Sequence, residues 1–119
     1  MNTVVKNLDA PDETRSFEHG TLALARVGSV TIGRARFEPG WRWSNDVKPI
    51  AGTESCMVHH KGYAISGRLH VVMDDGSELD VGGGDAHEIL PGHDAWVVGD
   101  EPYIAVDFSE EIAGYAKPA

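Results

Sequence analysis

The residues best suited to chemistry lie in one short stretch, from Glu54 to His60. It holds a carboxylate, a thiol and two imidazoles, at Glu54, Cys56, His59 and His60. Alternate side chains of an extended strand point to one face, so Glu54, Cys56 and His60 would project together while His59 points away. Thiolate, imidazole and carboxylate groups are the usual protein ligands of transition metals. The spacing therefore predicts one part of a metal site.

A second polar cluster, Pro91-Gly92-His93-Asp94, follows further along the chain. His93 shares a strand face with Ala95, which has no ligand atom, so we expect His93 to complete a site with Cys56 and His60. Glu54 would be an optional further ligand. Sulfur and nitrogen ligands suit Zn²⁺, Fe²⁺ or Cu better than Mg²⁺, and an open coordination position would admit water or a substrate.

Each of these residues also has an ordinary structural interpretation, which the sequence leaves open. A lone cysteine is commonly a small buried apolar residue, and adjacent histidines can be a solvated pair. Glu54 could pair with an arginine, and Asp94 could either orient the His93 imidazole or cap the turn. A metal-free thiolate–imidazole pair of Cys56 and His60 is a less favoured alternative. The remaining histidines are not expected to be ligands: His19, His70 and His87.

The elements that would position these residues are short apolar runs separated by glycine-rich turns, which predict an all-β fold. The 14 glycines in 119 residues fit this pattern, and Asp74-Asp75-Gly76 is a strong hairpin signal. We expect residues 44–53 to form a loop. The absence of a convincing long helix favours a β-sandwich or β-barrel. The predicted strands are residues 21–27, 29–37, 63–65, 68–73, 77–81, 86–90, 95–98 and 103–108.

The length predicts a single domain spanning residues 1–119. Within it we expect an N-terminal arm at 1–20 that lies along a sheet edge, a barrel at 21–108 and a tail at 109–119. The net charge of −9 makes nucleic acid and anionic membranes poor partners. A single cysteine, no signal peptide and no apolar run long enough to span a bilayer lead us to expect a cytoplasmic protein.

From residue 38 onward the order of strands and turns resembles the cupin family, whose members are double-stranded β-helix (jelly-roll) barrels. Their first motif is Gly-x5-His-x-His-x3 or x4-Glu-x6-Gly. Aligning its last glycine with Gly67 places its glutamate at His60 and its two histidines at Cys56 and Glu54. The stretch Tyr63-Ala64-Ile65-Ser66-Gly67 is typical of small one-domain members. The resemblance covers roughly residues 30 to 108.

The second cupin motif is Gly-x5-Pro-x-Gly-x2-His-x3-Asn. Aligning its first glycine with Gly84 places its second glycine at Gly92 and its histidine at Ala95. Its proline position falls on Leu90, one residue before Pro91, and its asparagine position falls on Gly99. A typical cupin binds Fe, Mn, Ni or Zn through three histidines and one glutamate. The resemblance therefore implies the fold, and it implies a metal site whose usual ligands are altered here.

The resemblance also implies a small-molecule ligand inside the barrel, and a homodimer. Our first hypothesis is a non-standard metal centre, with Zn or Fe favoured over Mn, Ni or Cu, that serves an oxygenase, isomerase, lyase or hydrolase reaction. The alternative is a non-catalytic binding or sensor module without a metal, which the alanine at Ala95 favours. Other residues expected near the ligand are Arg36, Trp43, Tyr63 and Asp94. For Arg36 a solvated outer face is slightly favoured over a position in the barrel, whereas Tyr63, with its hydroxyl at an edge, and Trp96 are expected in the core.

Overall fold

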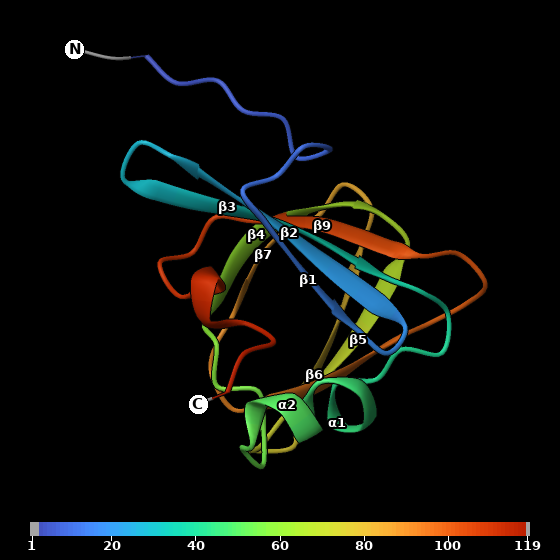
Figure 1. Cartoon of the computed structure of the whole chain (residues 1–119). Coiled ribbons are helices and arrows are strands. Elements are labelled where there is room, and N and C mark those ends of the chain that lie inside the picture. The colour runs from blue at the N-terminus through green and yellow to red at the C-terminus, as the bar shows by residue number, and fades with distance from the viewer. Residues whose placement is uncertain (1–2, 119) are drawn as a thin grey trace.

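The computed structural model describes residues 3–118 as two antiparallel β-sheets that share one core (Figure 1). The larger sheet has six strands in the order β1-β2-β3-β9-β4-β7, and the smaller has three in the order β6-β5-β8. The all-β prediction is confirmed. The strands are β1 (Glu13–Phe17), β2 (Gly20–Val27), β3 (Val30–Phe37), β4 (His60–Ser66), β5 (Arg68–Met73), β6 (Glu78–Gly82), β7 (Ala86–Ile89), β8 (His93–Val97) and β9 (Tyr103–Asp107).

The turns form where the sequence predicts them, because they hold residues that tolerate the required backbone. Gly28, at φ 63°, lies between β2 and β3, where Val27 pairs with Val30. Between β5 and β6, Gly76 has φ 91° and the Asp75 carboxylate accepts a 2.9 Å hydrogen bond from the Ser77 N–H. A positive φ is easy for glycine and strained for other residues. These tight turns make sequential strands antiparallel neighbours.

The segment predicted as a loop at 44–53 instead contains two short helices, α1 (Trp43–Asp46) and α2 (Lys48–Ala51). Trp43 and Val47 are buried, so this segment closes one end of the core. The Asp46 carboxylate accepts a 3.0 Å hydrogen bond from the Arg42 N–H, which holds the first turn. Pro and Gly signals indicated a loop, but burial of these apolar side chains stabilises single helical turns instead.

Segments near both ends of the chain pack onto the body of the molecule. Strand β1 pairs with β2 over its whole length, so the predicted arm becomes the edge strand of the larger sheet from Glu13 onward. Residues 3–12 precede it and lead away from the body of the molecule (Figure 1). The tail contains the 3-10 helix η1 (Ile112–Gly114), and both Ile112 and Tyr115 are buried.

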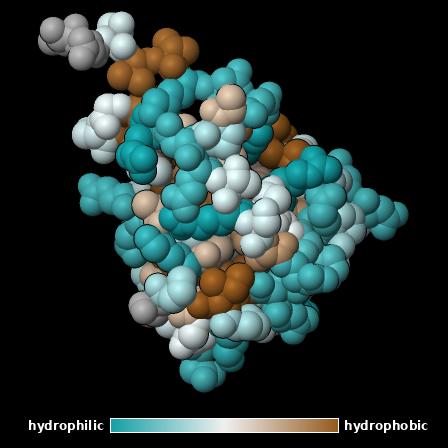
Figure 2. Space-filling view, viewed as in Figure 1, coloured by the Kyte–Doolittle hydropathy of each residue, from teal (hydrophilic) through white to brown (hydrophobic). Residues whose placement is uncertain are grey.

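The core lies between the sheets and is built from alternate residues of the strands of both. The face of the molecule in Figure 2 is mainly hydrophilic, with apolar side chains confined to small patches. Trp96 was expected in the core, but it lies half-buried on the outer side of β8, 4.1 Å from the Arg42 guanidinium. The inward positions of β8 are His93, Ala95 and Val97, so Trp96 necessarily points outward. Within residues 3–118, no helix is long and apolar enough to cross a membrane.

Candidate metal centre

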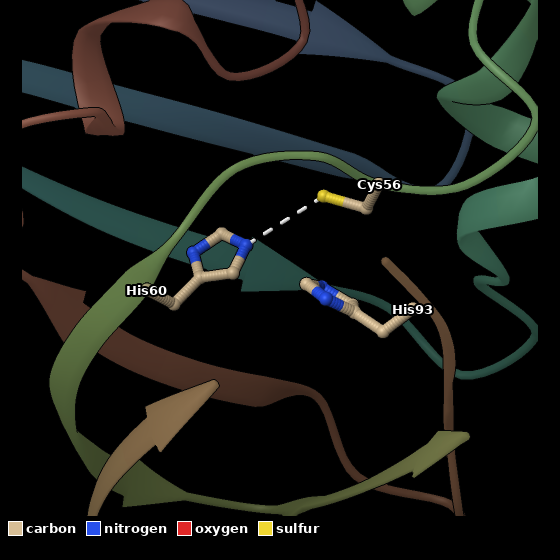
Figure 3. Close-up of side chains that lie close together, drawn as sticks. All are labelled: Cys56, His60 and His93. Atoms are coloured by element: carbon tan, nitrogen blue, oxygen red, sulfur yellow. Dashed lines mark hydrogen bonds between the residues drawn. The ribbon is translucent and has the colours of Figure 1, made fainter. Parts of the chain in front are cut away.

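Three of the four predicted metal ligands converge in the core. Cys56, His60 and His93 each offer a ligand atom, and these atoms all lie within 4.8 Å of one another. Figure 3 shows the three side chains pointing toward a common space, with Cys56 Sγ 3.7 Å from His60 Nε2. The His60 and His93 ring centroids are 5.3 Å apart. The arrangement brings one sulfur and two nitrogen donors together.

The backbone around Cys56 differs from the continuous strand that the sequence suggested. Cys56 forms an isolated bridge with His93, in which the Cys56 N–H donates to the His93 carbonyl at 2.8 Å. The Gly92 N–H donates back to the Cys56 carbonyl at 2.8 Å. Residues 57–59 belong to no strand, and β4 begins at His60. Cys56 and His60 therefore meet because one is held by β8 and the other starts β4.

Hydrogen bonds fix the orientation of both imidazoles. His60 Nδ1 donates to Asp107 Oδ2 at 2.6 Å, and His93 Nδ1 donates to the Leu90 carbonyl at 2.8 Å. These contacts leave Nε2 of each ring available to a metal. A carboxylate or carbonyl on the other ring nitrogen is the usual support of a metal-bound histidine. Asp107 also accepts a 2.8 Å hydrogen bond from the Ser109 N–H, which holds the carboxylate in place.

The charges of the site are strongly coupled. Burial alone would raise the pKa of the Cys56 thiol, but hydrogen bonds to His60 and His93 outweigh it and lower the pKa from 9.0 to about 6. Burial alone would lower the pKa of His60, but hydrogen bonds to Asp107 and Cys56 raise it from 6.5 to about 9. Burial alone would raise the pKa of the Asp107 carboxyl, but its hydrogen bond to His60 outweighs burial and the pKa is lowered. The cysteine is therefore a thiolate at neutral pH, the form that binds metals.

The geometry fits a tetrahedral ion after small adjustments. Typical Zn–S and Zn–N bonds place sulfur and nitrogen ligands about 3.6 Å apart. The observed distance from Cys56 Sγ to His60 Nε2 is 3.7 Å. The upper limit of 4.8 Å within the cluster exceeds the tetrahedral spacing by roughly 1 Å, which modest side-chain rotation can close. The donor set suits Zn²⁺, Fe²⁺ or Cu.

Glu54, the fourth predicted ligand, lies outside this group. Its side chain is 96% exposed and accepts a 3.2 Å hydrogen bond from Lys48 Nζ. Asp94 forms no hydrogen bond with the His93 ring; its Oδ1 accepts hydrogen bonds from the backbone N–H groups of Ser44 at 3.1 Å and Ala95 at 2.9 Å. It therefore holds the start of α1 against β8. His93 is oriented by the Leu90 carbonyl instead, and the carboxylate that orients an imidazole of the cluster is Asp107, at His60.

Two of the residues expected near a ligand lie on the outer surface. Arg36 is exposed and hydrogen-bonds Glu38 Oε2 at 2.8 Å, as expected from its alternation with the inward Ala35 and Phe37. Tyr63, expected in the core with its hydroxyl at an edge, is 48% exposed because Gly62 and Ala64 are the inward residues of β4. Trp43, by contrast, lines the interior cavity.

The interior cavity adjoins the cluster and has a volume of about 50 Å³. His60, His93 and Asp107 line it, and both sheets contribute to its wall. Asp107 is not among the predicted site residues, although it alternates with Tyr103 and Ala105 along β9 and so shares their inward face. His87, which was not expected to be a ligand, also lines the cavity. The other lining residues are Leu22, Ala35, Phe37, Trp41, Trp43, Leu69, Val71, Ile89, Ala95, Tyr103, Ala105, Ile112 and Tyr115.

Solved structures share this architecture. A protein from Klebsiella pneumoniae with a double-stranded β-helix domain aligns at TM-score 0.59 and 20% identity, covering 90% of this chain and 89% of that chain. The oxalate decarboxylase of Lactobacillus farciminis aligns at 0.58 and 17%, covering 90% of this chain and 31% of that one. KdgF from a Halomonas species aligns at 0.54 and 15%, covering 81% and 83%. Neither a known family model nor a curated protein sequence matches the chain.

This chain has the cupin fold. The resemblance found in the glycine pattern is thereby confirmed at the level of the fold. Relative to the cupin motifs, His60 stands in the glutamate position and Cys56 in a histidine position. The other two histidine positions hold Glu54 and Ala95, and Ala95 lines the cavity. His93 lies two residues earlier on the same inward face of β8, so it enters the same interior from an adjacent position.

Proposed function

We propose that this cupin-fold protein binds a transition-metal ion through Cys56 Sγ, His60 Nε2 and His93 Nε2, and acts on a small molecule in the adjoining cavity. One observation carries the proposal: hydrogen bonds hold both imidazoles by their Nδ1 atoms, so their Nε2 atoms are the ones left to the cluster with Cys56. A buried thiolate at the same point adds a soft, charged ligand. Zn²⁺ and Fe²⁺ are the favoured ions.

The contribution of the chain's own residues follows from their contacts. Asp107 holds the proton on His60 Nδ1, and the Leu90 carbonyl holds the proton on His93 Nδ1. The apolar wall of the cavity excludes bulk water from the cluster and strengthens its electrostatic interactions. A bound metal would supply a Lewis acid with an open coordination position. Oxygenation, isomerisation, lyase and hydrolytic chemistry all use such a centre.

The test is metal analysis of protein purified without a histidine tag. We expect one equivalent of Zn or Fe per chain, and a rise in melting temperature when Zn²⁺ is added to metal-free protein. Cys56→Ser and His60→Gln should each abolish both effects. His59→Gln is the matched control, because His59 neighbours His60 but hydrogen-bonds Glu88 at 2.8 Å outside the cluster. The proposal would be contradicted if the purified protein contained no metal and its melting temperature did not change when Zn²⁺, Fe²⁺, Mn²⁺, Ni²⁺ or Cu²⁺ was added.

A non-catalytic binding module is the second candidate, and Ala95 favours it because the position of a usual cupin ligand has no donor atom. This candidate requires a cavity that binds small molecules without the metal. It predicts ligand-dependent stabilisation that persists in the double variant His60→Gln, His93→Gln. Loss of all ligand stabilisation in that variant would exclude it. The homodimer and the cytoplasmic location expected from the sequence stay predictions.

A further inference from the structure

The cavity beside the metal centre is lined by two residues that each carry a buried polar atom without a partner. Trp41 is 2% exposed, and its indole Nε1 has no hydrogen-bond partner within residues 3–118. The same is true of His87 Nδ1. Both residues line the cavity that His60 and His93 also line. The third such atom in the described chain, Ser109 Oγ, belongs to a residue outside the cavity wall.

An indole N–H can only donate, so its missing partner must be an acceptor. Buried donors are normally paired, and an unpaired one destabilises the fold. Trp41 also stacks on Phe37 with the ring planes 3° apart and the centroids separated by 3.8 Å, which fixes the indole in place. A fixed, desolvated donor on a cavity wall is suited to an oxygen acceptor of a bound molecule.

The rest of the wall limits what that molecule can be. Among residues 3–118, no lysine or arginine lines the cavity, and the lining carboxylate, Asp107, is already bonded to His60. A dianion would therefore find no side-chain cation other than the histidines. Most of the wall is aliphatic or aromatic. The cavity volume of about 50 Å³ is a few times the roughly 10–15 Å³ that a single water needs, so it suits a ligand of only a few non-hydrogen atoms.

We propose that the cavity binds a compact neutral carbonyl compound, an aldehyde or ketone, whose oxygen accepts a hydrogen bond from Trp41 Nε1. The apolar body of the ligand contacts residues such as Leu22 and Val71. His87 supplies a second polar contact through Nδ1. This proposal deepens the proposed function, and it rests on that function only for the statement that the ligand lies beside a metal. Carbonyl recognition itself depends on the cavity wall.

The experiment follows the indole N–H signals by NMR while acetone, 2-methylpropene or oxalate is added to wild-type protein. Acetone and 2-methylpropene have nearly the same shape but only acetone has an acceptor oxygen, and oxalate is a dianion. We expect acetone alone to shift the Trp41 indole proton downfield in a saturable manner. The Trp96 indole, on the outer side of β8, is the internal control and should not move. No saturable shift, or equal shifts with 2-methylpropene or oxalate, would overturn the proposal.

Variants separate the hydrogen bond from packing. Trp41→Phe removes the donor and His87→Leu removes the second contact, and each should weaken acetone binding about 3- to 10-fold, the loss expected for one hydrogen bond. Trp96→Phe is the matched control and should bind acetone as wild type does. If Trp41→Phe fails to fold, the wild-type titration and His87→Leu still decide. Unchanged acetone affinity in His87→Leu would remove the assigned role of His87.

The titration is run on metal-free and Zn²⁺-loaded protein, because the two proposals can fail separately. An acetone response without any metal binding would support the carbonyl site and reject the metal centre. Stoichiometric metal binding without an acetone response at Trp41 in either form would support the metal centre and reject the carbonyl site. The metal state is read independently, by elemental analysis of the same samples.

Discussion

His60 Nδ1 lies 2.6 Å from Asp107 Oδ2, and this pair joins the beginning of β4 to the end of β9. The two strands are antiparallel neighbours, and Asp107 lies opposite Gly62 in their register. The contact decides which imidazole nitrogen faces Cys56. Together with the hydrogen bond to Cys56 it raises the pKa of His60, so a residue that is not a candidate ligand affects both the orientation and the charge of the site.

Replacing Asp107 with Asn should weaken metal binding while keeping the shape of the side chain. The loss of a carboxylate behind a metal-bound histidine typically costs 10- to 100-fold in affinity, so we expect about that loss for Zn²⁺. Competition with a chromophoric chelator measures it. Glu88→Gln is the matched control, since it removes the carboxylate bonded to His59, outside the cluster. Equal Zn²⁺ affinities of the two variants would contradict the role of Asp107.

The metal-free protein should contain a Cys56 thiolate at neutral pH. The folded pKa of about 6 lies below the ordinary 9.0, so the thiol ionises as pH rises through 6 rather than through 9. Ultraviolet absorbance of the thiolate follows this step, with Cys56→Ser as the blank. His60→Gln removes a hydrogen-bond donor and a positive charge, so it should move the step to higher pH. A wild-type step near 9 would disprove the coupling.

This pair should add little pH dependence to the free energy of unfolding. Between about pH 6.5 and 9 the folded pair holds one proton, on His60, and the unfolded chain also holds one, on Cys56. Equal proton numbers in the two states give zero slope. Spectroscopy of the thiolate is therefore the informative measurement, and denaturation as a function of pH is not.

Metal affinity, by contrast, should depend on pH in this window. A metal bound at His60 Nε2 must displace the proton that this atom holds below pH 9 in the metal-free protein. The apparent dissociation constant should therefore fall about tenfold per pH unit from 6 to 9 and level off above 9, considering this pair alone. Asp107→Asn should move the levelling to lower pH. Calorimetry in buffers of different ionisation enthalpy counts the released proton, and none released at pH 7.5 would contradict the prediction.

Gly67 should be far less tolerant of a side chain than other glycines in turns. Its φ is 82°, and an added Cβ would lie 2.3 Å from the Pro102 carbonyl oxygen. Gly76 has a similar φ of 91° but nothing within 4 Å. Gly76→Ala should therefore cost only the left-handed backbone penalty of about 1–2 kcal/mol, whereas Gly67→Ala should cost more than about 4 kcal/mol or prevent folding. Urea denaturation compares them, and equal losses would contradict the steric explanation.

Much of the fold could be predicted because its signals are local. Gly28 and Gly76 indicate turns because glycine tolerates the backbone conformation that a turn requires. Alternation of residue types along β5 and β8 indicates which residues share a face of the sheet. Neither signal depends on knowing the partner strand. The helices at 43–51 could not be predicted, because single turns are stabilised by burial of Trp43 and Val47 against other elements. Tyr63 and Trp96 were misplaced for a related reason: an aromatic side chain alone does not show which sheet face is inward.

For the candidate site, the sequence shows the donor types at Cys56, His60 and His93, and alternation along β8 predicts that His93 shares the inward face of Ala95. The packing of the strands places Glu54 outside the group, holds Cys56 by a bridge to β8 and sets Asp107 beside His60, and none of this is visible in the sequence. Residue type and alternation can be seen from residues that are adjacent in the sequence. The pairing of β4 with β9, far apart in sequence, depends on the packing of the whole core, and that pairing brings Asp107 to His60.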